Sequence, residues 1–391
     1  MQSLKVSFTI LTYCGIWQPI YWTSGWHRTS FNFCRVVFRP LPYLLASAQL
    51  ARIALVDMSF EELTEVIFIL LSIVNICCKS VSILMRRADL IKLTKMLGIV
   101  SASPQDSDEF NIQHQYHQFI RYVTLSSLVL VEITAITFLI PPFFQPENNR
   151  TLPFKIWLPY DYSMDKLFWI TYFPESITII LASLISVSSN TLIFGFLIEA
   201  CGQFELLNHR FMTMPLYIED FAKGEKITTY EVCKLEKQLL SRNIRHHTFI
   251  FEFVDIFKKT FSSAIIGQYI VSSLVISTSV YQLSTNTTMD VVFFTNLLYL
   301  MCMLLEFFLY CWFGNELTVK SEDFGRKVFR TNWLALSTKS NKDIFVAMLR
   351  SSKPIIVSTG FFAVLSLESF MKIIKLSFSA FNVLRTASDY Q

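Results

Sequence analysis

Residues 66–85 read VIFILLSIVNICCKSVSILM, a run of twenty residues with a single charge, Lys79. As a helix this run is long enough to cross about 30 Å of hydrocarbon, which takes roughly 20 apolar residues. Six further apolar runs lie on either side of it along the chain. We therefore expect an all-α polytopic membrane protein, one bundle of seven transmembrane helices at about 37–55, 66–85, 119–141, 167–198, 260–283, 291–313 and 355–384.

Lys and Arg are distributed unevenly between these runs. Alternate segments, namely 1–39, 86–121, 201–259 and 314–354, hold 26 of the 34 Lys and Arg residues. The remaining segments, 57–65, 143–168 and 282–290, hold three. Because cytoplasmic loops are enriched in Lys and Arg, the first set is expected inside. The N-terminus is then cytoplasmic, and seven spans place the C-terminus outside the cell.

The composition agrees with a membrane protein. Hydrophobic residues make up 52% of the chain and charged residues 16%, against about 25% charged in soluble domains. The mean hydropathy is +0.43. The net charge of +4 follows from the inner segments, and no dense basic stripe predicts a nucleic-acid partner.

Two glycosylation sequons support the orientation. Asn149 and Asn286 are the acceptor residues of the only two Asn-x-Ser/Thr sites, and both fall in segments that the charge bias places outside. The eight cysteines lie in spans or on the inner side, so no disulfide is expected in an outer loop.

Sequence motifs of catalysis and metal binding are absent. The chain has no G-x-x-x-x-G-K-S/T, G-x-S-x-G, H-E-x-x-H or C-x-x-C motif, so we expect no enzyme, no cofactor and no metal site. His246 and His247 form the one histidine pair, but adjacent helical residues point about 100° apart. We expect this pair to pack against a neighbouring helix.

The N-terminus invites comparison with a signal peptide, since Lys5 precedes the apolar stretch 6–13. The stretch ends at Gly15–Pro19 without a small-x-small cleavage site. We therefore expect an uncleaved interfacial segment.

Ionisable residues inside spans are costly and are candidates for function. Lys79 lies near the inner end of its span, where we expect it to reach the surface by snorkelling. Glu132, Glu175 and Glu306 lie within the third, fourth and sixth spans. For these three residues, buried polar packing and a role in a pocket or in permeation are equally open.

The last apolar run carries a polar stripe. Glu368, Lys372 and Lys375 follow one another at spacings of four and three, and Ser379, Asn382 and Thr386 continue the same face. A polar face along a terminal membrane helix is typical of a helix that lines water.

Several C-terminal segments resemble one family, the insect odorant receptors. These are Phe313-Gly314-Asn315-Glu316-Leu317, Arg330-Thr331-Asn332-Trp333, Leu349–Pro354, Ser358–Phe362 and Leu365–Phe370, with Gly202–Leu207 at the end of the fourth span. The similarity is strongest over 313–384, moderate over 196–283 and topological before that. The seven-span topology of the family, with the N-terminus inside, agrees with the charge bias.

The resemblance implies a subunit of an odorant-gated, non-selective cation channel. Such subunits form a heterotetramer with a shared co-receptor in the plasma membrane of olfactory dendrites, and the final helix lines the pore. The pore-lining positions would be Lys375, Ser379, Asn382, Val383 and Thr386, with the constriction near Val383. Segments 199–259 and 314–354 would form a cytoplasmic anchor. At 391 residues, and without a long insertion before the fifth span, the chain resembles an odorant-binding subunit and not the co-receptor.

The odorant is expected in an apolar pocket between the outer halves of the second, third, fourth and sixth helices. Burial of a volatile hydrocarbon contributes about 25 cal/mol per Å². The aromatic residues at the outer ends also suit an interfacial belt. From depth and face, the predicted ligand contacts are Phe68, Ser72, Ile133, Thr134, Thr137, Phe173, Ile177, Phe294 and Leu298.

Two other receptor classes are alternatives. A gustatory receptor would share the topology, but the T-Y-x-x-x-x-x-Q-F pattern expected in its last helix is missing. A G-protein-coupled receptor would need the opposite orientation, and the chain has neither its D-R-Y triplet after the third span nor N-P-x-x-Y in the seventh.

Overall fold

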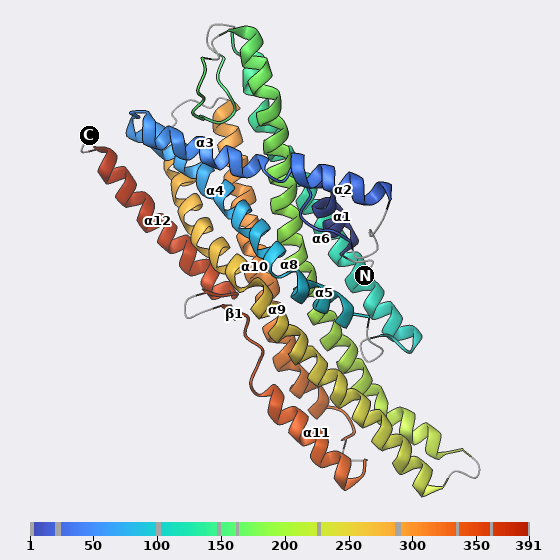
Figure 1. The fold of residues 1–391 in the computed structure, drawn as a ribbon. Helices are drawn as coiled ribbons and strands as arrows, with labels where there is room; N and C mark the ends of the chain where they lie inside the picture. The colour runs from blue at the N-terminus through green and yellow to red at the C-terminus, as the bar shows by residue number, and fades with distance from the viewer. Residues whose placement is uncertain are drawn as a thin grey trace.

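The computed structural model describes residues 4–19, 25–98, 103–146, 150–161, 164–224, 228–285, 291–333, 336–359 and 363–389. These residues form an elongated bundle of helices (Figure 1). Within them, five helices are long and apolar enough to cross a membrane. They are α4 (Phe60–Met85), α6 (Ser107–Leu139), α8 (Asp165–Ala222), α9 (Thr229–Thr285) and α10 (Val291–Phe329).

Shorter elements complete the fold. The helices are α1 (Lys5–Tyr13), α2 (Trp26–Val37), α3 (Leu41–Leu55), α5 (Arg87–Met96), α7 (Pro141–Phe144), α11 (Thr338–Ser351) and α12 (Leu367–Asp389). Two strands of two residues, β1 (Ser358–Thr359) and β2 (Ala363–Val364), pair antiparallel. Apart from this pair, the expectation of a helical protein agrees with the described residues.

Helix α8 forms the centre of the bundle. Every residue from 187 to 204 is buried, because α6, α9 and α10 pack around it. Apolar residues on every side of this stretch suit the central position, and its buried Thr191 and Asn190 hydrogen-bond to Ser7 of α1 and Lys79 of α4. Over Glu199–Arg210, past the expected end of the fourth span, all residues except Glu205 and His209 are still buried.

The first and last expected spans have different bounds in the structure. The run 37–55 is helical as α3 only from Leu41, because the separate helix α2 ends at Val37 and residues 38–40 form a turn. The run 355–384 becomes helical only at Leu367, because the chain before it is extended and pairs as β1 and β2. This extended segment presses on α10, where a Cβ on Gly314 would lie 2.3 Å from Cβ of Leu365.

The N-terminal helix α1 is packed into the bundle. Leu11 is fully buried, and the hydroxyl of Ser7 shares a 2.8 Å hydrogen bond with that of Thr191 in α8. A Cβ on Gly195 would lie 2.2 Å from Leu4, so the glycine permits this close approach. The described part of the expected interfacial segment is therefore inserted against α8.

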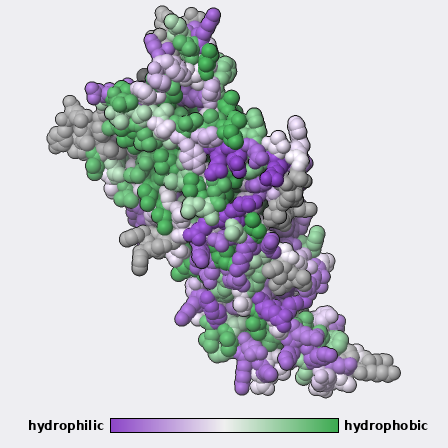
Figure 2. Space-filling view, viewed as in Figure 1, coloured by the Kyte–Doolittle hydropathy of each residue, from purple (hydrophilic) through white to green (hydrophobic). Residues whose placement is uncertain are grey.

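The two ends of the bundle differ in polarity. On the face in Figure 2, apolar side chains gather around α3, α4 and α12, whereas hydrophilic side chains dominate toward α11. We refer to these as the α3 end and the α11 end.

The α11 end contains buried ion pairs. Arg210 of α8 donates from Nε and Nη2 to the two carboxylate oxygens of Glu109, each at 2.8 Å, and both side chains are about 1–2% exposed. Glu205 accepts hydrogen bonds from two lysines of α10, from Lys320 at 2.9 Å and from Lys327 at 3.0 Å. Burial alone would raise the pKa of Glu205, but these two lysines outweigh it and hold the pKa below its usual value.

Candidate ligand cavity

A cavity of about 130 Å³, the inner cavity, lies between α3, α4, α6, α8 and α10. Most of its wall is aliphatic or aromatic, including Leu45, Ile73, Ala135, Phe138 and Ile179. An engineered cavity of about 150 Å³ with a similar apolar wall binds benzene. The inner cavity therefore has the size and surface for a small, mostly apolar molecule.

Polar groups enter this wall in hydrogen-bonded pairs. The hydroxyls of Ser72 on α4 and Tyr299 on α10 are 2.5 Å apart. Thr134 Oγ1 on α6 lies 3.0 Å from Cys302 Sγ on α10. These pairs join three of the cavity's helices, so the polar atoms also fix its shape.

An ion pair forms one end of the inner cavity. Lys79 Nζ of α4 lies 3.3 Å from Glu306 Oε1, and it donates to Asn190 Oδ1 at 2.6 Å. Tyr310 also donates to Asn190, at 2.8 Å. Lys79 is 1% exposed, so the expectation that it snorkels to the surface is wrong. Of the two residues of the ion pair, Lys79 and Glu306, it is Glu306 that lines the inner cavity.

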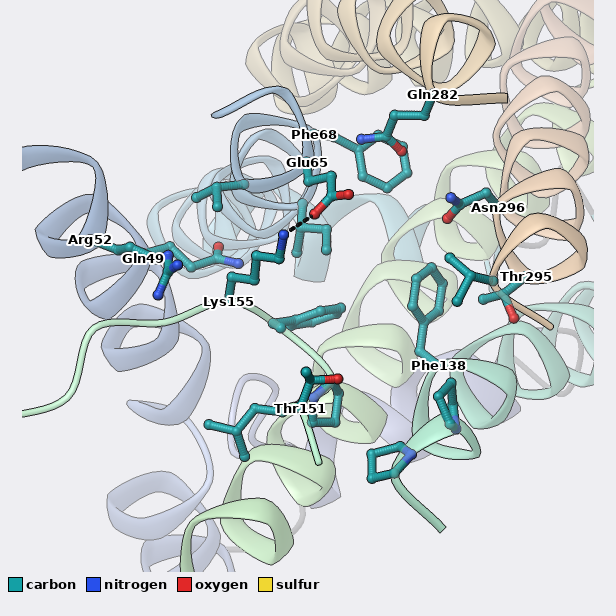
Figure 3. A pocket seen from close by; sticks show the side chains of 18 of the residues that line it. Gln49, Arg52, Glu65, Phe68, Phe138, Thr151, Lys155, Gln282, Thr295 and Asn296 are labelled. Atoms are coloured by element: carbon teal, nitrogen blue, oxygen red, sulfur yellow. Dashed lines mark ion pairs between the residues drawn. The ribbon is translucent and has the colours of Figure 1, made fainter. Parts of the chain in front are cut away.

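A second cavity, the outer chamber, has a volume of about 390 Å³ and is more polar (Figure 3). Gln49 and Arg52 of α3 border one side of it, and Asn296 of α10 borders the other. Lys155, from the segment before α8, forms an ion pair with Glu65, in which Nζ lies 2.6 Å from Oε2 (Figure 3). This ion pair ties that segment to α4.

The two cavities share part of their walls. Ile69, Phe138 and Phe154 line both. Glu175 of α8 positions the last of these, since its Oε1 accepts a 2.8 Å hydrogen bond from the backbone N–H of Phe154. The outer chamber and the inner cavity therefore adjoin at these side chains.

The predicted ligand contacts divide into two groups. Phe68 lines the outer chamber, and Ser72 and Thr134 line the inner cavity. The other six line neither of these two cavities: Ile133, Thr137, Phe173, Ile177, Phe294 and Leu298. Phe173 is 58% exposed, and the hydroxyl of Thr137 is occupied by the carbonyl of Thr134 at 2.7 Å.

Sequence reasoning missed several residues of the inner cavity, among them Asn75, Ser186, Tyr299 and Cys302. Glu306 was noted as a costly charge but was not assigned to the pocket. A usable signal was the polar and small residues of α10 at 295, 299, 302 and 306, whose spacing of three and four marks one face.

The other predicted sites lie on α12 or outside the described residues. Lys375, Ser379, Asn382 and Val383 lie on the exposed side of α12, whose opposite side packs on α9 through Ser377. The side chain of Thr386 is outside the described residues, as are Asn149 and Asn286.

The histidine pair packs between helices, as expected. His246 lies 3.1 Å from Arg210 Nη1 through Nδ1 and 2.8 Å from Gln203 Oε1 through Nε2. Because arginine can only donate, His246 is neutral and donates to Gln203. His247 stacks on Phe324. Across the residues that the structure describes, no group of three or more His, Cys, Asp or Glu is arranged to hold a metal ion.

The fold and the cavities together describe a helical membrane protein with an apolar cavity between its helices. Residues 59–378 match the family model described as 7tm Odorant receptor. This match covers most of the chain, which therefore belongs to the insect odorant receptor family.

Relatives support this assignment over different lengths. Odorant receptor 94a of Drosophila melanogaster is 21% identical and aligns over 100% of this chain and 98% of its own length. Odorant receptor Or1 of Anopheles gambiae is 22% identical over 98% of this chain and 95% of its own. With odorant receptor 67c of Drosophila melanogaster, 22% identical, the alignment spans 61% of this chain and about half, 56%, of the relative.

A solved structure shares the fold. The olfactory receptor OR5 from Machilis hrabei, in complex with eugenol, superposes with a TM-score of 0.82 at 16% identity, covering 98% of this chain and 97% of that one. The likeness extends from α1 to α12.

Proposed function

We propose that this chain is the odorant-binding subunit of a ligand-gated, non-selective cation channel and that the inner cavity binds the odorant. The observation that carries the proposal is an apolar cavity enclosed by helices of the bundle, with a few convergent polar groups. Family membership supports it. So does the occurrence of OR5, which has the same fold, in complex with the small molecule eugenol.

The proposed topology has seven spans with the N-terminus inside. Helices α3 and α12 would complete the five long apolar helices. Helix α3 has 15 residues and α12 carries Glu368, Lys372 and Lys375, so neither resembles an ordinary lipid-facing span. The Lys and Arg bias supports the orientation, and with it a cytoplasmic anchor at 199–259 and 314–354.

The proposed channel is a heterotetramer with a co-receptor in the plasma membrane of olfactory dendrites. Exposure of the polar side of α12 supports a pore lined by Lys375, Ser379, Asn382, Val383 and Thr386. A polar face directed into lipid would be costly, whereas a central aqueous pore would hydrate it. Asn149 and Asn286 would be glycosylated on the outer side.

The test is co-expression with an insect co-receptor and recording of membrane current during exposure to a broad odorant panel. We expect at least one odorant to evoke a cation current that cells with the co-receptor alone do not give. Ala182, which is 5% exposed and lines the inner cavity, offers a way to block it. Ala182→Phe should raise the half-maximal odorant concentration at least tenfold, because the new ring occupies the cavity.

Phe173→Ala is the matched control, because Phe173 lies on the same helix and lines neither cavity. It should leave the dose-response curve unchanged. Absence of any odorant current in surface-labelled cells would reject the channel function. An Ala182→Phe receptor with unchanged odorant sensitivity would place the binding site elsewhere.

A further inference from the structure

The hydrogen-bonding capacity of the inner cavity is unevenly used. The hydroxyl of Tyr299 can donate to Ser72, whose own hydroxyl reaches the carbonyl of Phe68 at 3.3 Å. Thr134 donates to the carbonyl of Leu130 at 2.9 Å, and the Ser183 hydroxyl is within 2.8 Å of both Glu132 and the Ile180 carbonyl. The donors in these parts of the wall are therefore already occupied by protein acceptors.

One strong acceptor is left open at the end of the cavity. Glu306 accepts from Lys79 through Oε1, and within the described part of the chain Oε2 accepts no hydrogen bond. The side chain is 15% exposed and lines the cavity, so its carboxylate is available to a ligand bound there. A carboxylate oxygen without a donor in an apolar setting is costly, and a ligand donor would remove that cost.

One hydroxyl near this acceptor is also unused. Ser186 lines the inner cavity and makes no hydrogen bond within the described residues. It precedes Asn190 by four residues on α8, so it lies one helical turn from the residue that holds Lys79. Ser186 can therefore donate to a ligand atom close to Glu306.

The charge at this end is already balanced. Lys79 and Glu306 form a one-to-one ion pair at 3.3 Å. A cationic ligand would add an unmatched positive charge to an apolar cavity, at a large desolvation cost. An ether or ketone has no donor for Glu306. A neutral hydroxyl offers one donor and one acceptor, which matches Glu306 and Ser186.

Building on the proposed odorant-binding function, we propose that the inner cavity selects small neutral alcohols or phenols, whose hydroxyl donates to Glu306 Oε2 and accepts from Ser186 Oγ. The volume of about 130 Å³ suits a ligand with one aromatic ring or a short branched chain. The apolar wall around Ile73 and Ile179 contacts the hydrocarbon part.

The test compares four probes of nearly equal size on the co-expressed channel: benzyl alcohol, benzyl methyl ether, toluene and benzylamine. Benzyl alcohol should be about tenfold more potent than the ether and toluene, which corresponds to about 1.4 kcal/mol. Benzylamine, charged at pH 7, should be the weakest. This ranking needs no variant, so it does not depend on the folding of a mutant.

Two variants assign the effect to residues. Lys79→Met with Glu306→Met removes the acceptor and both charges together, a change that buried ion pairs often tolerate. It should reduce the preference for benzyl alcohol over the ether to less than threefold. Ser186→Ala keeps the ion pair and should weaken the alcohol and the ether relative to toluene. Glu132→Gln, a carboxylate outside the cavity wall, is the matched control and should keep the ranking.

The outcomes separate the two proposals. Currents evoked by the apolar probes without a preference for the alcohol would overturn the hydroxyl selectivity and leave the odorant-gated channel intact. The same holds if the alcohol preference survives in the Lys79→Met, Glu306→Met receptor at normal surface level. Silence toward all four probes and toward the broad panel would reject the channel function itself, and the selectivity with it.

Discussion

The α3 end and the α11 end of the bundle are built from the same helices in opposite ways. Toward the α11 end, residues 187–204 of α8 are all buried, Phe204 is fully buried, and Arg210 and Glu109 form an ion pair closed to solvent. At the α3 end, α4, α6 and α10 separate around two cavities of about 130 and 390 Å³. The comparison indicates that α8 is held by buried contacts toward the α11 end, whereas at the α3 end it borders the inner cavity.

The cost of this arrangement can be estimated. An empty cavity destabilises a protein by about 24 cal/mol per Å³, so the inner cavity alone corresponds to roughly 3 kcal/mol. A bound ligand would recover part of that energy. We expect the free energy of unfolding to be more sensitive to substitutions at the α11 end, where Arg210 and Glu109 form a buried ion pair, than at the α3 end. Three predictions test this difference.

The largest effect is expected from Arg210→Met. It would leave the Glu109 carboxylate buried at 1% exposure without its bidentate partner, and breaking a buried pair costs about 3–5 kcal/mol. Heating of detergent-solubilised receptor, followed by size-exclusion chromatography, should show a large loss of folded protein. The double change Arg210→Met with Glu109→Met should recover most of it, and a single variant as stable as the wild type would contradict the prediction.

A smaller effect is expected from pH. Burial and then the charge of Arg210 lower the pKa of His246 from 6.5 to about 3. Below about pH 6.5 the unfolded chain therefore binds a proton at His246, whereas the folded protein does not. The stability from this residue is complete above pH 6.5 and is lost as the pH falls toward 3, by about 2 kcal/mol at pH 5.

His246→Gln provides the control for this pH effect. Glutamine keeps a donor and an acceptor for Gln203 and Arg210 but does not titrate. Thermal unfolding of the variant should change less between pH 7.5 and 5 than that of the wild type. Parallel pH curves for the two proteins would rule His246 out as the cause.

The smallest effect is expected at the α3 end, from Lys155→Met. Lys155 and Glu65 are 40% and 49% exposed, and exposed ion pairs contribute about 0–1 kcal/mol. The same unfolding assay should show a shift near its detection limit, with Lys223→Met, in another exposed pair, as reference. A loss as large as that of Arg210→Met would remove the distinction between the two ends.

The sequence predicted which segments cross the bundle better than which faces meet. Runs such as 66–85 are apolar for about twenty residues, and all five helices built on such runs formed. Helix α3 differed because Pro40 and Pro42 mark its start, and α12 differed because the chain before Leu367 is extended and pairs as β1 and β2; hydropathy registers neither.

On α8 and α10 the predicted ligand contacts and the residues that line the inner cavity lie on different faces of the same helices, so the two sets differ by a rotation about the helix axis. On α8 the prediction chose Phe173 and Ile177, whereas Ile179 and Ser183, on a neighbouring face, line the cavity. On α10 it chose 294 and 298, whereas Tyr299 and Cys302 line it. Hydropathy cannot fix this rotation, because lipid and a ligand cavity both accept apolar side chains.

The contact between α1 and α8 has a consequence for biosynthesis. Ser7 and Thr191, which share a hydrogen bond, are 184 residues apart. At a synthesis rate of about 5–20 residues per second, α1 leaves the ribosome roughly 10–40 s before its partner exists. During that interval the apolar side of α1, including Leu11, needs a temporary cover, from lipid or from a chaperone of the insertion machinery. Helix α1 therefore cannot take its final place until α8 has been made.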